Sequence, residues 1–229
     1  MRHPMMSVLE QNPVLPAVKD AGRLEACLAQ PAGVVFLLCG DILNIDRLID
    51  RVHQAGKYAV VHADLVAGLA PREIAVDFLH RCGADGIIST RQSFIRRAKE
   101  LGLAAILRVF LLDSISLESL GKMPANLPDC LDILPGTMPK ILRRVCADAK
   151  VPVLTGGLIA DKEDVMAALD AGAMDVLVAD TPAKIKDAWA ARSSFLEAIM
   201  HETKLLDECD VVVPVNKIAD YMEDNHTHF

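Results

Sequence analysis

Aromatic residues are scarce in this chain. They make up 4% of its 229 residues, while apolar residues make up 52%. The core must therefore be built from Val, Ile, Leu and Ala, which is typical of a parallel sheet buried on both faces. A chain of this length buries a large core without disulfides or metal ions.

Several common sequence signatures are also missing. No apolar run is long enough to span a membrane, and the N-terminus has no signal-peptide core, so we expect a cytoplasmic protein without membrane contact. The six cysteines form no C-x-x-C pair and favour buried free thiols in a reducing compartment. Neither G-x-G-x-x-G after the first strand nor a P-loop motif is present, so we expect no nucleotide cofactor.

An excess of positive charge is absent as well. The net charge is −7, whereas proteins that bind nucleic acids without selectivity normally carry a basic balance. Any RNA contact must therefore use a local basic patch and be selective or conditional.

What the sequence does contain is an alternation of strands and helices, repeated eight times. This alternation with short links implies right-handed crossovers and a parallel sheet. An open doubly wound sheet is the rival, but it usually stops at five or six strands. We therefore predict a single (β/α)8 TIM barrel over residues 1–200, with a C-terminal extension at 201–229. The expected strands are Val14–Lys19, Val34–Asp41, Tyr58–Leu65, Gly86–Thr90, Ala104–Asp113, Cys130–Pro135, Val151–Gly156 and Asp175–Asp180.

Three helices have clear boundaries in the sequence. Asn44 is the expected N-cap of a helix that ends at Gly56, and Asp161 with Asp164 opens a helix that ends at Gly172. Pro71 fits the first turn of another helix, whose buried stripe we predict as Ile74, Ala75, Phe78, Leu79 and Cys82. The remaining helices are expected after Asp20, Thr90, Ser114, Thr137 and Pro182.

In a barrel of this type, ligands bind where the strands end and the following loops begin. Polar residues stand at all eight of these positions. His62 and Asp64 are two residues apart and are expected on the same side of their strand. The set comprises Lys19-Asp20, Gly40-Asp41, His62, Asp64, Ser89-Thr90-Arg91, Arg108, Asp113-Ser114, Gly136 with Lys140, Gly156-Gly157 and Asp180-Thr181.

Each of these residues also has a structural interpretation. Asp20, Asp41, Thr90 and Ser114 are candidate helix N-caps, and His62 is equally a candidate hydrogen-bonded core residue. The cations Lys19 and Arg108 need an anion nearby, which is either a ligand or an internal carboxylate.

Asp41, His62 and Asp64 form the one candidate metal cluster. It has a single histidine, and hydrogen bonds between these groups are the better interpretation, so we expect no metal. No Ser/His/Asp or Cys/His arrangement has positional support as a nucleophile.

Gly156-Gly157 is the sharpest local signal. Two glycines after the seventh strand allow backbone N–H groups to approach an anion, and the N-terminus of the next helix adds a partial positive charge. The loops after strands seven and eight are the usual phosphate site of such barrels. The position of this glycine pair therefore predicts a small, phosphorylated ligand.

Seven segments, in order from about Asn12 to Gly172, resemble the glycerol uptake operon antiterminator family, the glycerol-3-phosphate-responsive regulators. They are Asn12-Pro-Val-Leu-Pro-Ala-Val-Lys19-Asp20, Val35-Phe-Leu-Leu-Cys-Gly40-Asp41-Ile, Val61-His62-Ala-Asp64-Leu-Val-Ala-Gly68-Leu, Gly86-Ile-Ile-Ser89-Thr90, Arg108-Val-Phe-Leu-Leu-Asp113-Ser114, Ile133-Leu-Pro135-Gly136-Thr-Met-Pro139-Lys140 and Gly156-Gly157-Leu-Ile.

The resemblance implies a barrel that senses glycerol 3-phosphate and then binds an mRNA leader, preventing premature termination. Placed on this fold, Gly156 and Gly157 hold the phosphate. The other expected ligand-binding residues are Lys19, Asp41, His62, Asp64, Ser89, Arg108, Asp113 and Gly136.

The sequence departs from the family at the end of the eighth strand. The family usually has small hydroxyl residues there, whereas this chain has Val178-Ala179-Asp180. An ionised Asp180 facing a phosphate costs on the order of 2–4 kcal/mol per unit-charge pair, unless a cation compensates or Asp180 caps the last helix. The tail after Met200 is also longer than the family pattern requires.

Three functions stay open at this point. The first is an RNA-binding regulator gated by its ligand, with two candidate RNA surfaces that are equally ordinary solvated helix faces. The second is an isomerase, aldolase or lyase acting on a small phosphorylated metabolite, and the third is an assembly partner; a homo-oligomer is compatible with each. The candidate RNA-binding residues are Arg91, Arg96 and Arg97 on the fourth helix, and Lys140, Arg143 and Arg144 on the sixth.

Overall fold

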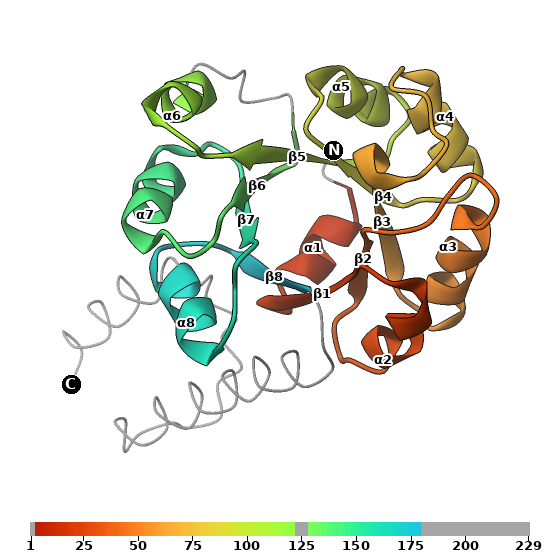
Figure 1. The fold of residues 1–229 in the computed structure, drawn as a ribbon, viewed down its shortest axis with the longest axis horizontal. Helices are drawn as coiled ribbons and strands as arrows, with labels where there is room; N and C mark the ends of the chain where they lie inside the picture. Colours follow the sequence, from red (N-terminus) through yellow and green to blue (C-terminus); the bar gives the residue numbers. More distant parts are fainter. Residues whose placement is uncertain (1–2, 122–127, 180–229) are drawn as a thin grey trace, which may run out of the picture.

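The computed structural model describes residues 3–121 and 128–179. Eight parallel strands close into a barrel, each pairing with the next in the chain and the last with the first (Figure 1). This arrangement confirms the predicted (β/α)8 barrel. The strands are β1 (Val14–Val18), β2 (Val34–Leu37), β3 (Tyr58–His62), β4 (Gly86–Ser89), β5 (Ala104–Phe110), β6 (Cys130–Leu134), β7 (Val153–Gly156) and β8 (Asp175–Ala179).

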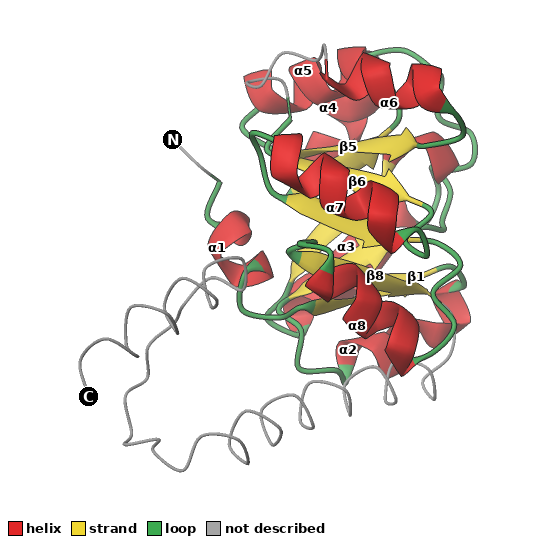
Figure 2. Cartoon of the chain, turned by 90° about the vertical axis from the view of Figure 1, so that its left-hand side faces the viewer, coloured by secondary structure: helices red, strands yellow, loops and turns green. Residues whose placement is uncertain are grey.

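Helices surround the sheet and join consecutive strands (Figure 2). Two short 3₁₀ turns, η1 (Ala21–Arg23) and η2 (Ala63–Leu65), follow β1 and β3. The helices are α1 (Met5–Leu9), α2 (Leu24–Leu28), α3 (Ile45–Gln54), α4 (Ile74–Arg81), α5 (Gln92–Glu100), α6 (Ser114–Gly121), α7 (Pro139–Asp148) and α8 (Lys162–Asp170). No helix in these residues is long and apolar enough to cross a membrane.

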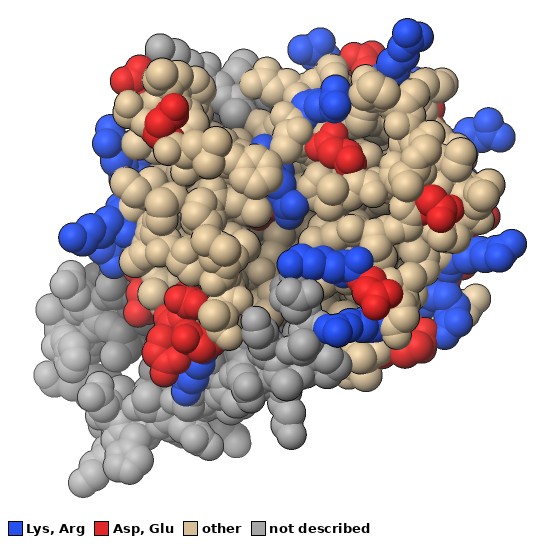
Figure 3. Space-filling model, viewed as in Figure 1, with Lys and Arg blue, Asp and Glu red and all other residues tan. Residues whose placement is uncertain are grey.

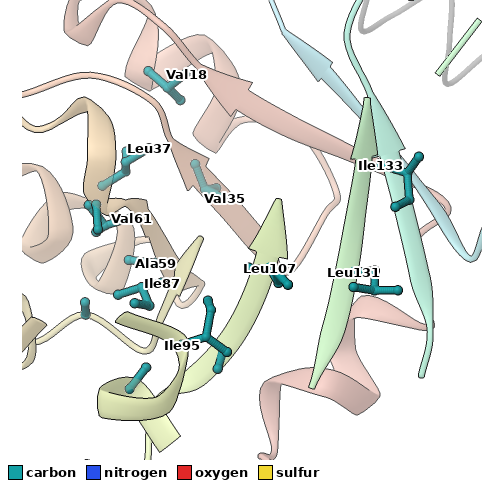
Figure 4. Packing of buried hydrophobic residues seen from close by; sticks show 14 of the residues in the cluster. Val18, Val35, Leu37, Ala59, Val61, Ile87, Ile95, Leu107, Leu131 and Ile133 are labelled. Atoms are coloured by element: carbon teal, nitrogen blue, oxygen red, sulfur yellow. The ribbon is translucent and has the colours of Figure 1, made fainter. Parts of the chain in front are cut away.

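The buried side chains form two aliphatic clusters, as the composition predicts. One fills the barrel and includes Leu15, Val60 and Ile106. The other packs the outer faces of the strands against the helices, and Figure 4 shows part of it. Its members there include Val35 of β2 and Ile95 of α5. Strand residues alternate between these two clusters, so sequence parity decides which side chains reach the barrel interior.

Helix α1 was not predicted, and it closes the N-terminal end of the barrel (Figure 2). Its Met5, Met6 and Leu9 side chains are fully buried in the interior cluster. The N-terminal end of the barrel is therefore covered by apolar groups, which leaves the carboxyl end as its polar mouth.

The predictions for two helices need correction. Helix α4 begins at Ile74, three residues after Pro71, so Pro71 does not occupy its first turn. Ile74 is 65% exposed, whereas Val76 is buried together with Ala75 and Leu79, so the buried face of α4 differs from the predicted stripe. Asn44 does precede α3, but its side chain bonds to Asp41 rather than to a helix N–H.

Three strands end three or four residues earlier than predicted. β2 ends at Leu37, β3 at His62 and β5 at Phe110, and the residues that follow turn away from the sheet. Asp64 consequently lies in η2 rather than on β3. The expectation that His62 and Asp64 share one side of a strand was wrong, because alternation ends with the strand. Asp180, the helix after Pro182 and the extension at 201–229 lie outside the described residues.

Candidate ligand site at the carboxyl end of the barrel

The strand registers place four inward-facing residues at one level near the carboxyl end. The path around the barrel passes from each residue to its paired residue on the next strand and then one residue further along that strand. On alternate strands this path meets Ala17 of β1, His62 of β3, Arg108 of β5 and Gly156 of β7, and it then returns to Ala17. Barrel interiors are filled by such layers from alternate strands. This layer thus sets two basic side chains beside two residues of little volume, and we call it the mouth layer.

Arg108 forms an ion pair inside the barrel. Its Nε lies 2.6 Å from Oδ2 of Asp132, and the two side chains are only 9% and 0% exposed. Asp132 belongs to the next layer down, which the same register rule fills with Phe36, Ile88 and Leu177. Burial raises the pKa of Asp132, and the Arg108 cation opposes that rise. The anion that a buried Arg108 requires is therefore an internal carboxylate.

Sequence reasoning missed Asp132. The available signal was its inward parity in a strand whose neighbours are apolar, together with the need of Arg108 for an anion. One Asp132 oxygen, Oδ1, has no hydrogen-bond partner among the described residues. A guanidinium has five N–H donors, and the hydrogen bond from Arg108 to Asp132 engages only Nε.

His62 lies in the mouth layer as a neutral imidazole. It is 4% exposed, and burial, reinforced by the Arg108 cation, lowers its pKa to about 4 while Asp64 opposes the shift. Within the described residues its Nδ1 has no hydrogen-bond partner. His62 is therefore not a core histidine whose hydrogen bonds are all made within the described residues.

Asp64 holds the loop between β4 and α5. It accepts hydrogen bonds from Ser89 Oγ at 3.0 Å, from the Thr90 N–H at 2.7 Å and from the Arg91 Nε at 3.2 Å. Ser89 is fully buried and also accepts from the Arg91 N–H at 3.1 Å. These two predicted site residues thus belong to a network that ties η2 to the loop between β4 and α5.

The other predicted acidic residues also fasten loops. Asp41 accepts from the Leu43 N–H at 2.8 Å and from Asn44 Nδ2 at 2.9 Å. Asp20 accepts from the Gly22 N–H at 3.0 Å and so caps η1, as the structural interpretation proposed.

The caps of α5 and α6 differ from the predicted ones. Asp113 accepts from the Ser116 N–H at 2.8 Å, so Asp113 rather than Ser114 caps α6. At α5 the cap position belongs to Arg91 rather than Thr90.

The glycines at this end are explained largely by packing. A Cβ on Gly156 would lie 3.0 Å from Leu177 Cβ and 3.1 Å from Leu177 O, and one on Gly136 would lie 2.9 Å from Thr155 Oγ1. The Gly136 N–H donates to Gly156 O at 2.6 Å, so it is already engaged. Gly157 is exposed and has a φ of +72°, a conformation that suits glycine.

The predicted help from the next helix N-terminus is not supported. Asp161 accepts from the Asp164 N–H at 2.9 Å, and Asp164 accepts from the Ala160 N–H at 2.8 Å. Glu163 adds a third carboxylate to the first turn of α8. These side chains already offset the positive end of the helix.

The basic residues on the outer helices differ in their pairing. On α5, Arg97 forms ion pairs with Asp77 at 2.5 Å and with Glu100 at 2.8 Å. Arg91, just before α5, pairs with Asp64. Arg96 has no ion pair in the described residues. On α7, Lys140, Arg143 and Arg144 are exposed and form no ion pair within residues 3–121 and 128–179. Their spacing places them on one helix face.

Figure 3 looks onto the carboxyl ends of the strands. Lys and Arg atoms lie near the centre of this face, and others project from the edge where α7 lies in Figure 1. Lys19, the residue that directly follows β1, is exposed. No group of His, Cys, Asp and Glu in the described ranges is arranged to hold a metal ion.

These features define a (β/α)8 barrel with an apolar closed end and a mouth that carries buried and exposed cations. The family model for the glycerol-3-phosphate responsive antiterminator matches residues 14–182, which include all eight strands. The chain therefore belongs to this family, and family and fold together support a regulatory role.

Three proteins resemble this chain over most of its length, and two of them are described as antiterminators or antiterminator-related. A protein of Escherichia coli (strain K12) described as "Uncharacterized protein YgcP" is 38% identical over 78% of this chain and 94% of its own length. The glycerol uptake operon antiterminator regulatory protein of Listeria monocytogenes is 31% identical over 73% of this chain and 91% of its own, with a TM-score of 0.69. An antiterminator-related protein of Thermotoga maritima is 29% identical over 76% of this chain and 98% of its own, with a TM-score of 0.67.

A second similarity concerns the end of the chain. The family model for the C-terminal domain of FAD linked oxidases matches residues 159–227, which begins before α8 and runs beyond the described residues. A 54-residue stretch is 70% identical to a D-lactate dehydrogenase of Anaerostipes hadrus, over 24% of this chain but only 11% of that protein. The family-model match at residues 159–227 includes most of the extension at 201–229, which lies outside the eight strand–helix units.

Proposed function

We propose that this protein is a transcription antiterminator that binds glycerol 3-phosphate at the barrel mouth and, in that state, binds an mRNA leader. Family membership supports the regulatory class. The observation that carries the ligand proposal is Arg108, held by Asp132 in the mouth layer with guanidinium N–H groups beyond its bonded Nε. Exposed Lys19 and Gly157 at the rim supply a cation and a backbone N–H.

The proposed RNA surface is the exposed face of α7. Lys140, Arg143 and Arg144 lie three and four residues apart and stand clear of the ion pairs that neutralise much of α5. Cations that form no ion pair with the described part of the chain can contact phosphate oxygens from one helix face, and such contacts supply most of the salt-dependent affinity for RNA. A local surface of this kind is compatible with a net charge of −7.

The ligand proposal is tested by isothermal titration of the full chain with glycerol 3-phosphate. Lys19→Ala removes a charge-assisted contact worth about 1.5–3 kcal/mol, so affinity should fall roughly 10- to 150-fold. Arg51→Ala removes a cation that pairs with Glu25 on the outside of the barrel and should leave affinity unchanged. If the wild type does not bind, or if both variants bind like it, the ligand proposal fails.

The same titration separates a sensor from an enzyme. A sensor leaves glycerol 3-phosphate unchanged over hours, which phosphorus NMR of the mixture measures. Conversion of the ligand, lost in Lys19→Ala, would instead support the isomerase, aldolase or lyase alternative.

A further inference from the structure

Three polar side chains lie inside a barrel whose other side chains at their level are apolar. His62 and Arg108 occupy the mouth layer, and Asp132 lies just below it among Phe36, Ile88 and Leu177. All three are largely buried, and they come from three different strands. This set, which we call the polar floor, is therefore built into the sheet rather than carried on loops.

The charge of the polar floor distinguishes it from a phosphate site. Arg108 and Asp132 form an ion pair at 2.6 Å, so their charges offset each other. A phosphate placed here would face the carboxylate of Asp132 at close range in a poorly solvated site. A neutral polar group meets no such repulsion.

Two buried atoms of the polar floor have no partner in the described part of the chain. They are Nδ1 of His62 and Oδ1 of Asp132. Buried polar atoms are normally hydrogen-bonded, because an unmade bond costs about 1–3 kcal/mol. The Asp132 oxygen accepts, neutral His62 offers one donor and one acceptor nitrogen, and Arg108 donates, so the floor suits hydroxyl groups, which both donate and accept.

We propose that the polar floor binds the hydroxyl end of a small polyol phosphate, while the phosphate stays above it at the rim. This inference rests on the proposed function and gives the ligand a direction in the barrel. Lys19 follows the last residue of β1 and is exposed, two residues beyond Ala17 of the mouth layer, so its backbone is at most about 6.6 Å further toward the carboxyl end. That spacing is roughly the reach of a three-carbon chain with its ester oxygen, so one ligand can contact floor and rim together.

The test compares glycerol 3-phosphate with n-propyl phosphate, which keeps the phosphate and lacks both hydroxyls. Titration calorimetry of the wild type should show glycerol 3-phosphate binding at least about 100-fold more tightly, because the analogue leaves the floor atoms unpaired. Glycerol and inorganic phosphate, which lack the phosphate and the carbon chain respectively, should each bind more weakly than glycerol 3-phosphate.

Two variants should separate the floor from the rim. His62→Leu should weaken glycerol 3-phosphate at least tenfold and leave n-propyl phosphate unchanged, whereas Lys19→Ala should weaken both phosphates equally. His62→Gln, which restores an amide donor and acceptor, should recover part of the preference. Thermal unfolding of each variant checks that it is folded.

The outcomes distinguish failure of this inference from failure of the proposed function on which it rests. Equal binding of both phosphates by the wild type overturns the polar floor while the sensing role stands, and that measurement needs no variant. An unchanged preference in folded His62→Leu overturns it as well. If the wild type binds neither phosphate, both proposals fall.

Discussion

Single residues in the barrel interior differ in how their charge is compensated. Asp132 has Arg108 beside it, whereas Asp175 is 1% exposed and neither of its oxygens has a hydrogen-bond partner in the described residues. Burial, with Glu10 adding to the effect, raises the pKa of Asp175 well above its ordinary value. Asp175 is therefore protonated in the folded protein at pH values where the unfolded chain has already lost that proton.

This difference makes the free energy of unfolding depend on pH. From the unfolded pKa of about 3.9 upward, the folded state holds a proton that the unfolded state has lost, so stability falls by up to about 1.4 kcal/mol per pH unit until the folded pKa is reached. Asp175→Asn should remove that loss, giving a higher Tm at pH 8 and a flatter profile from pH 4 upward. Asp170→Asn, at an exposed position on α8, is the matched control. Equal pH profiles of wild type and Asp175→Asn would contradict this account.

Substitution of Gly156 tests whether packing or ligand contact requires glycine at this position of the mouth layer. An alanine Cβ there would meet the Leu177 backbone oxygen at 3.1 Å, so Gly156→Ala should lower the free energy of unfolding by about 1–3 kcal/mol in urea titrations. Gly121→Ala, whose Cβ meets nothing within 4 Å, should be neutral or up to about 1 kcal/mol more stable. A fully stable Gly156→Ala protein with weakened ligand binding would show that packing is not what requires glycine.

Individual elements show what the sequence could reveal. All eight strands were predictable, because β-branched runs and helical periodicity alternate clearly. Their ends were not, since the last residues of β3 and β5 depend on where neighbouring strands stop pairing. This is why His62 was correctly placed in the strand and Asp64 was not.

The candidate site was predictable only in part. Their positions near the ends of apolar strands identified Arg108 and His62 as unusual, but the partner of Arg108 became visible only when the sheet closed and brought β6 beside β5. Helix α1 was missed because five residues carry too little periodicity to distinguish a helix from a loop.

Helix α7 carries the prediction about RNA. Arg143→Ala with Arg144→Ala removes two exposed cations, so leader-RNA affinity should fall and the slope of log affinity against log salt should decrease by about 2. Arg47→Ala with Arg81→Ala removes the same charge from α3 and α4 and should leave both unchanged. Fluorescence anisotropy over a salt series measures this. Equal losses in the two double variants would mean that overall charge, rather than α7, governs binding.

At the scale of the whole molecule, the proposed function is a coupling between the barrel mouth and an outer helix face. The barrel is closed by α1 at one end, so the proposed ligand site and the loops that Asp41, Asp64 and Asp113 fasten are at the other. Those loops lead into α3, α5 and α6, and the β6–α7 loop with Gly136 leads into α7. We therefore propose that ligand binding at the mouth acts on the segments from which the outer helices start.

Coupling of this kind is reciprocal, because the free energy that links two bound ligands is the same in either direction. The most direct measurement is the affinity of the full chain for the leader RNA of a glycerol-metabolism operon from its own genome, with and without saturating glycerol 3-phosphate. We predict that the ligand tightens RNA binding at least tenfold, and that saturating RNA tightens glycerol 3-phosphate binding by the same factor. RNA affinity that is identical with and without the ligand would contradict the account.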